Sequence, residues 1–82
     1  MDHNQILTEL KKIFSNVFNR RDLEITENTK SGEFESWDSL AEVRLTLAIE
    51  QKFNIKFDIE EIMQINNIGD MVKLIQNRIE DR

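Results

Sequence analysis

The sequence has no cysteine, no proline, only two glycines and a single histidine. Without cysteine, the chain can form no disulfide, no thiolate nucleophile and no zinc site of the finger type. His3 lies alone near the N-terminus, so it cannot be assigned to a metal site or a Ser-His pair. We therefore expect no catalytic machinery in the chain itself. Because proline and glycine break helices and are scarce here, we expect helix packing to hold the fold together.

Long hydrophobic runs are also missing, since the longest is Leu47-Ala48-Ile49. We therefore expect neither membrane insertion nor a signal peptide. Acidic residues outnumber basic ones by 16 to 11 and give a net charge of −5, which favours basic partners and disfavours nucleic acid. A chain of 82 residues suits a single domain, spanning 1–82, with one modest core. We expect the protein to be a monomer in the cytoplasm.

Apolar side chains recur at the helical spacing of about 3.6 residues in three stretches. A single stripe in the first stretch contains Ile6, Leu7, Leu10, Ile13, Phe14, Val17 and Phe18. A second helix is predicted from Ser39 to about Phe53, and a last one starts near Asn67 with Ile68, Met71, Val72, Ile75 and Ile79 on one side. A short third helix is predicted from Asp58, with Glu61 as its capping partner. The pattern predicts an all-α fold, a small four-helix bundle of three longer helices and one short one.

The helix from Ser39 to Phe53 carries two apolar stripes. At about 100° per residue, they lie on opposite sides of the helix. One contains Leu40, Val43 and Leu47, and the other contains Leu45, Ala48, Ile49 and Phe53. One stripe can enter the core. The other either stays exposed as a docking surface or is covered by the short helix or by the loop at 20–37, which Leu23, Ile25, Phe34 and Trp37 are expected to pin down.

Ser39 stands at the start of this helix. The residues Ser39-Leu40-Ala41-Glu42 fit the capping box S-x-x-E, so the serine taken alone is interpreted as a helix cap. Its setting is Glu35-Ser36-Trp37-Asp38-Ser39-Leu40, after a long loop and before an amphipathic helix. This setting resembles the Asp-Ser-Leu attachment motif of the acyl carrier protein family. The resemblance covers nearly the whole chain, because 38–53 is similar to the second helix of that family and 55–75 to its third and fourth helices.

The resemblance implies that a separate phosphopantetheinyl transferase moves 4′-phosphopantetheine from coenzyme A to the hydroxyl of Ser39, beside Asp38 and Leu40. The thiol of this arm would hold acyl or aminoacyl groups as thioesters, which suits a chain without cysteine. A helix N-terminus also favours the phosphodiester, because its N–H groups and dipole attract an anion. Asp38 would orient the serine, contact the transferase or only complement the dipole. Further implied partners are an acyl- or aminoacyl-loading ligase and synthase or transferase enzymes of fatty-acid, polyketide or other specialised biosynthesis.

Members of that family present acidic residues of the second helix to basic patches on their enzymes. The implied docking residues here are Leu40, Glu42, Val43, Arg44, Leu47, Glu60 and Glu61. Arg44 departs from the pattern, because it stands where many fatty-acid carriers have an acid, and Ala41 lacks a charge beside the attachment site. These departures favour a specialised carrier that serves a dedicated pathway.

Other functions also fit parts of the sequence. The main alternative is an unmodified helical interaction module in which Ser39 is only a cap. A calcium loop would use Glu27, Thr29, Ser31, Gly32 and Asp38, but it has too few carboxylates and no glutamate at its last position, so we expect no metal. Nucleic-acid binding through Lys11, Lys12, Arg20 and Arg21 is opposed by the net charge. A hydrolase with Ser39 as nucleophile lacks a nearby base.

Overall fold

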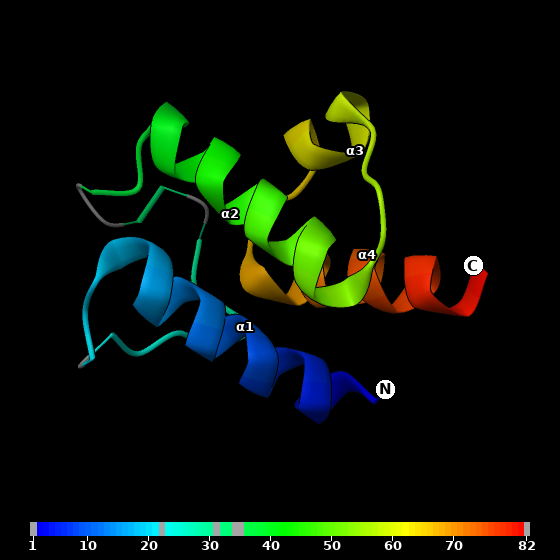
Figure 1. Cartoon of the computed structure of the whole chain (residues 1–82), viewed down its shortest axis with the longest axis horizontal. Coiled ribbons are helices and arrows are strands. Elements are labelled where there is room, and N and C mark those ends of the chain that lie inside the picture. The colour runs from blue at the N-terminus through cyan, green and yellow to red at the C-terminus, as the bar shows by residue number, and fades with distance from the viewer. Residues whose placement is uncertain (1, 22, 31, 34–35, 82) are drawn as a thin grey trace.

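The computed structural model describes residues 2–21, 23–30, 32–33 and 36–81, and it folds into four helices. These are α1 (His3–Phe18), α2 (Ser39–Phe53), α3 (Ile59–Met63) and α4 (Ile68–Asp81). The helix α1 packs against both α2 and α4, and the short α3 lies on the other side of α2 from α1 (Figure 1). The predicted all-α bundle of three longer helices and one short one is confirmed. Among the described residues, no helix combines the length and apolar character that crossing a bilayer requires.

Local side-chain contacts explain where the helices begin and end. Asp2 caps α1, because its carboxylate accepts a hydrogen bond of 2.8 Å from the backbone N–H of Gln5. The predicted starts of α3 and α4 are confirmed: Glu61 accepts from the backbone N–H of Asp58, and Asn67 accepts from that of Asp70. Two asparagines in the left-handed conformation end α1 and α2, Asn19 at φ 53° and Asn54 at φ 56°.

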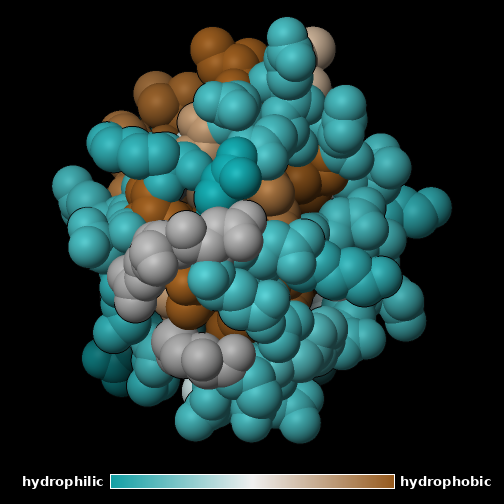
Figure 2. Space-filling view, turned by 90° about the vertical axis from the view of Figure 1, so that its right-hand side faces the viewer, coloured by the Kyte–Doolittle hydropathy of each residue, from teal (hydrophilic) through white to brown (hydrophobic). Residues whose placement is uncertain are grey.

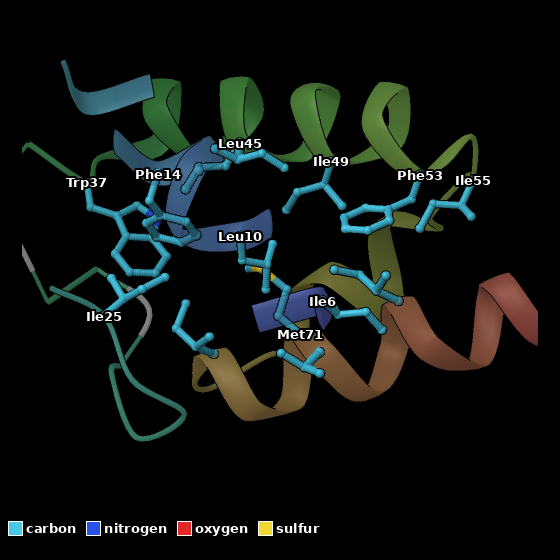
Figure 3. Close-up of a cluster of buried hydrophobic side chains, with 14 of the residues drawn as sticks. Ile6, Leu10, Phe14, Ile25, Trp37, Leu45, Ile49, Phe53, Ile55 and Met71 are labelled. Atoms are coloured by element: carbon cyan, nitrogen blue, oxygen red, sulfur yellow. The ribbon is translucent and has the colours of Figure 1, made fainter. Parts of the chain in front are cut away.

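The core fills the space between α2 and the pair α1 and α4. Leu45, Ile49 and Phe53 point from α2 into this space, as Figure 3 shows, and they are at most 4% exposed. The buried residues of α1 are Ile6, Leu10, Ile13 and Phe14, and those of α4 include Ile68, Met71, Val72 and Ile75. The stripes predicted from periodicity thus supply the core. Each fully buried side chain of this size contributes about 1.5–3 kcal/mol before the entropy cost of ordering it.

The long connection between α1 and α2 is pinned to the rest of the fold at several points. Ile25 and Trp37 are buried, as predicted, and Leu23 packs partly against the core, whereas Phe34 lies outside the described residues. The backbone carbonyls of Glu27 and Thr29 also accept hydrogen bonds of 2.9 Å from the first two N–H groups of α4. A Cβ on Gly69 would lie 3.3 Å from the Glu27 carbonyl oxygen, so glycine permits this close approach. These contacts fix the loop that leads into Ser39.

Candidate functional site

Ser39 is the first residue of α2, but it does not cap that helix. The N-cap is Asp38, whose carboxylate accepts a hydrogen bond of 2.9 Å from the backbone N–H of Ala41. The capping-box interpretation of Ser39 was therefore wrong. An aspartate one residue earlier serves the same role, and its charge also complements the helix dipole. Ser39 is exposed, and its hydroxyl has no hydrogen-bond partner among the described residues.

Trp37 anchors the turn that precedes Ser39. Its indole is 5% exposed and meets the ring of Phe14 edge-on, with the centroids 5.1 Å apart. Figure 3 shows the two rings at one end of the core, beside Ile25. The indole N–H donates to the carboxylate of Glu42, which lies one turn into α2. Ser39 thus sits between two anchored residues. Our sequence reasoning expected Trp37 to pin the loop but missed its bond to Glu42.

A groove of about 470 Å³ opens beside Ser39 and reaches α3. Its walls combine the indole of Trp37 and the carboxylate of Glu42 with the apolar side chains of Ile62, Met63 and Ile65. A phosphodiester on Ser39 would face the N-terminus of α2, where a negative charge is favoured. An arm extended from that point has room in the groove. The exposed hydroxyl, the helix end and the groove together fit a covalent 4′-phosphopantetheine.

The outward side of α2 stays uncovered. Leu40 is 60% exposed, and Val43 and Leu47 are each 54% exposed. On α3, Ile59 and Met63 are exposed by more than three quarters. Figure 2 shows hydrophobic side chains gathered at the top of the face in view, the level at which Figure 1 places α2 and α3. Of the two outcomes left open by the sequence, the structure therefore has the exposed one.

The charged residues expected to dock partners differ in how available they are. Arg44 and Glu60 are exposed. Glu42 is half-buried against Trp37, and Glu61 accepts from the Asp58 backbone and pairs with Arg78. Ala41, which has no charge to offer a partner, is 7% exposed and belongs to the core.

Arg78 holds α3 against α4. No residue of α3 is buried, so packing alone holds this helix weakly. The guanidinium of Arg78 donates to the backbone carbonyl of Lys56 over 3.0 Å, pairs with Glu61, and lies 3.9 Å from a carboxylate oxygen of Asp58. We did not anticipate this contact, because it joins residues 17 or more positions apart without any local pattern.

The side chains proposed for a calcium loop are engaged elsewhere. The hydroxyl of Thr29 accepts a hydrogen bond of 2.8 Å from the backbone N–H of Thr26, and Thr29 is 6% exposed. Glu27 pairs with His3 at the start of α1, and Asp38 caps α2. Ser31 lies outside the described residues. Each of the three engaged side chains thus has a structural role in holding the loop or a helix end.

Comparison with known proteins identifies the family. The model of the phosphopantetheine attachment site matches residues 8–75, which contain all of α2 and α3. The chain belongs to the phosphopantetheine attachment-site family. The predicted family is thereby confirmed, together with the covalent 4′-phosphopantetheine that the resemblance implied. Members of this family act as carriers rather than as catalysts.

Relatives and solved structures of the phosphopantetheine attachment-site family extend the match to most of the chain. An acyl carrier protein of Wolinella succinogenes is 35% identical over 71 residues, covering 87% of this chain and 93% of the relative. That of Coprothermobacter proteolyticus is 32% identical and covers 96% of both chains. The solution structure of a holo acyl carrier protein from Geobacter metallireducens superposes with a TM-score of 0.85 at 29% identity, covering 92% of this chain and 86% of that one. An acyl carrier protein from Thermotoga maritima shares the fold with a TM-score of 0.84, at 20% identity and with 99% and 94% of the two chains covered.

Proposed function

We propose that this protein carries acyl or aminoacyl groups as thioesters on a 4′-phosphopantetheine arm attached to Ser39. The observation that supports this assignment most strongly is the exposed hydroxyl at the first position of α2, which no described residue engages because Asp38 caps the helix. In the attachment step, the oxygen of Ser39 bonds to the phosphorus that carries the pantetheine of coenzyme A. The pyrophosphate P–O bond of coenzyme A breaks, adenosine 3′,5′-bisphosphate leaves, and the hydroxyl proton passes to a base of the transferase or to water. When bound, the arm supplies the thiol that the chain lacks.

The residues around Ser39 have distinct roles in this proposal. Asp38 fixes the turn by capping α2, and its position next to the serine also lets it contact the modifying transferase. The N-terminus of α2 stabilises the negative phosphodiester. Leu40 follows the serine and is 60% exposed, so it gives the transferase an apolar contact beside the reacting hydroxyl. The chain itself catalyses no step.

Docking of partner enzymes is assigned to α2 and α3. Leu40, Val43 and Leu47 form the apolar part of the surface, and Arg44, Glu42, Glu60 and Glu61 supply its charges. Glu42 and Glu61 already have partners within the chain. We therefore expect them to contribute less to the affinity for partner enzymes than Arg44 and Glu60 do. The proposed partners are a phosphopantetheinyl transferase, a loading ligase, and synthases or transferases that use the thioester.

The departure at Arg44 supports a dedicated biosynthetic pathway with its own loading ligase. We also propose that the carrier works as a monomer in the cytoplasm, where coenzyme A is available for its modification. The alternative function, an unmodified interaction module, is supported by the exposed side chains of α2. It no longer has a capping role to explain Ser39, because Asp38 fills that role.

The test is intact-mass analysis after incubation with coenzyme A and a broad-specificity phosphopantetheinyl transferase. We expect one phosphopantetheine per chain for the natural sequence and none for Ser39→Ala. Ser36→Ala is the matched control, because this serine is also exposed and lies three residues earlier. It should be modified fully. A natural chain that gains no mass would favour the interaction module, and an adduct on Ser39→Ala would refute the attachment site.

A further inference from the structure

The outward side of α2 surrounds one positive charge with apolar side chains. Five exposed residues of α2 lie within one arc of about 100° around the helix axis. We call this set the α2 stripe: Leu40, Val43, Arg44, Leu47 and Gln51. Arg44 is the charged member of this set. Among the residues that the structure describes, its guanidinium has no hydrogen-bond or ion-pair partner. The α2 stripe therefore has a formal charge of +1, although the whole chain has a charge of −5.

The two acidic residues of α2 are both engaged away from the α2 stripe. The carboxylate of Glu42 is half-buried and accepts from the indole of Trp37. That of Glu50 is also half-buried and accepts a hydrogen bond of 2.9 Å from the backbone N–H of Phe57. Both carboxylates thus stabilise the fold. A partner that approaches α2 meets the free cation of Arg44 before either acid.

A complex that covers the α2 stripe must remove water from the guanidinium of Arg44. An unpaired buried cation is unfavourable, and a row of cations on the partner would add like-charge repulsion. A carboxylate removes both problems, because it pairs with a guanidinium through two parallel hydrogen bonds. Leu40, Val43 and Leu47 would exclude water around that pair.

We propose that the enzyme that uses this carrier faces the α2 stripe with an apolar surface containing a carboxylate that pairs with Arg44. This inference rests on the proposed function, which makes α2 a docking helix. The inference adds that the partner carries a negative charge where it meets Arg44. On α3, the exposed Glu60 suits a cation on the rim of that partner.

The experiment uses the holo protein and, as a probe, an acyltransferase that binds its usual carriers through a cationic surface. Transfer to the natural chain should be slow. Arg44→Glu should raise kcat/KM by about tenfold or more, mainly through a lower KM, and Arg44→Gln should have an intermediate effect. Replacing the probe's facing cation by glutamate should reverse the order, so that the natural chain becomes the better substrate. The matched control Lys73→Glu makes the same charge change on an exposed position of α4 and should stay within about twofold.

Two results with the Arg44 variants would overturn the inference. In one, the natural chain reacts with the cationic probe at least as fast as Arg44→Glu. In the other, all variants react equally, including equal inactivity. If Lys73→Glu raises kcat/KM as much as Arg44→Glu does, the effect comes from net charge in general, and the inference is also refuted. The state of Ser39 is measured first by intact mass, so a failure to acquire the arm counts against the carrier function and is distinguished from a failure of the docking charge.

Discussion

The two sides of α2 use similar residues for opposite purposes. Leu45 is fully buried, whereas Leu47, two positions further, is 54% exposed. The first belongs to a layer that meets α1 and α4, as Figure 3 shows, and the second to the α2 stripe. Hydrophobicity alone therefore does not determine the role of a residue in this helix. The register of the helix does, because two positions correspond to a rotation of about 200°.

Truncating each leucine to alanine tests directly whether the two sides of α2 have different roles. Leu45→Ala should lower the free energy of unfolding by about 2–5 kcal/mol, because it leaves a cavity in a packed core. Leu47→Ala should change it by less than about 0.5 kcal/mol, since an exposed side chain loses few contacts. Urea denaturation followed by circular dichroism measures both. Comparable losses in the two variants would mean that the α2 stripe is part of the core.

Trp37 links the core to the outer part of α2, because its buried indole donates a hydrogen bond to the carboxylate of Glu42, next to the turn that leads into Ser39. Trp37→Phe keeps an aromatic ring against Phe14 and removes the N–H donor. We expect it to lower the unfolding free energy by about 1–2 kcal/mol and to slow the modification of Ser39.

The control for this prediction is Glu42→Gln, which keeps a carbonyl oxygen as acceptor for the indole and should lose less stability than Trp37→Phe. Intact-mass analysis of samples quenched at successive times gives the modification rate, and denaturant titration gives the free energy of unfolding. If Trp37→Phe is modified at the natural rate, the hydrogen bond does not position Ser39.

Arg78 tests whether α3 is held independently of the core. Arg78→Gln should release α3 while leaving the core between α1, α2 and α4 intact, because the clamp is polar and α3 buries no side chain. Hydrogen exchange at the backbone amides of Glu61 and Ile62, which bond to the carbonyl of Asp58, should become faster. Amides in the middle of α2 should keep their protection. Faster exchange in both helices would show that α3 supports the whole fold.

The smallest expected effect involves the contact between α1 and α2 at Glu9. Desolvation pushes the pKa of Glu9 upward, but hydrogen bonds and charges from Lys52 and Lys12 outweigh it and hold the pKa below its usual value. The ammonium groups lie 3.4 Å and 3.5 Å from the carboxylate oxygens. A lowered pKa in the folded state contributes stability above the unfolded value, and this contribution disappears as the pH falls through the folded value.

Glu9→Gln should therefore be slightly less stable than the natural chain near neutral pH, and the difference should vanish in acid. Urea midpoints at several pH values measure the difference, which is small because both lysines are exposed to solvent. A difference that grows as the pH falls would contradict this assignment.

Periodicity was enough to predict the three longer helices and their share of the core, because burial repeats with the turn of the helix, and the short α3 was predicted from its capping pair. The two apolar sides of α2 follow from the same rule, but which of them stays exposed does not. The cap was mispredicted because Asp38 and Ser39 are both good caps, and their sequence alone does not show which one bonds to the backbone. The Arg78 clamp and the bond from Trp37 to Glu42 depend on tertiary contacts. The hydrogen bonds of Glu42 and Glu50 also depend on tertiary contacts, so the sequence did not predict them. Among the described residues, these bonds leave Arg44 as the free charge on the outward side of α2.

The most direct test of the central claim is fragmentation mass spectrometry of the protein produced in its own host, which locates any modification on the chain. The account predicts a phosphopantetheine on the peptide that contains Asp38, Ser39 and Leu40, attached to Ser39, with or without an acyl group on its thiol. A native protein that stays unmodified even when its own transferase and coenzyme A are supplied, or one modified at another residue, would contradict it.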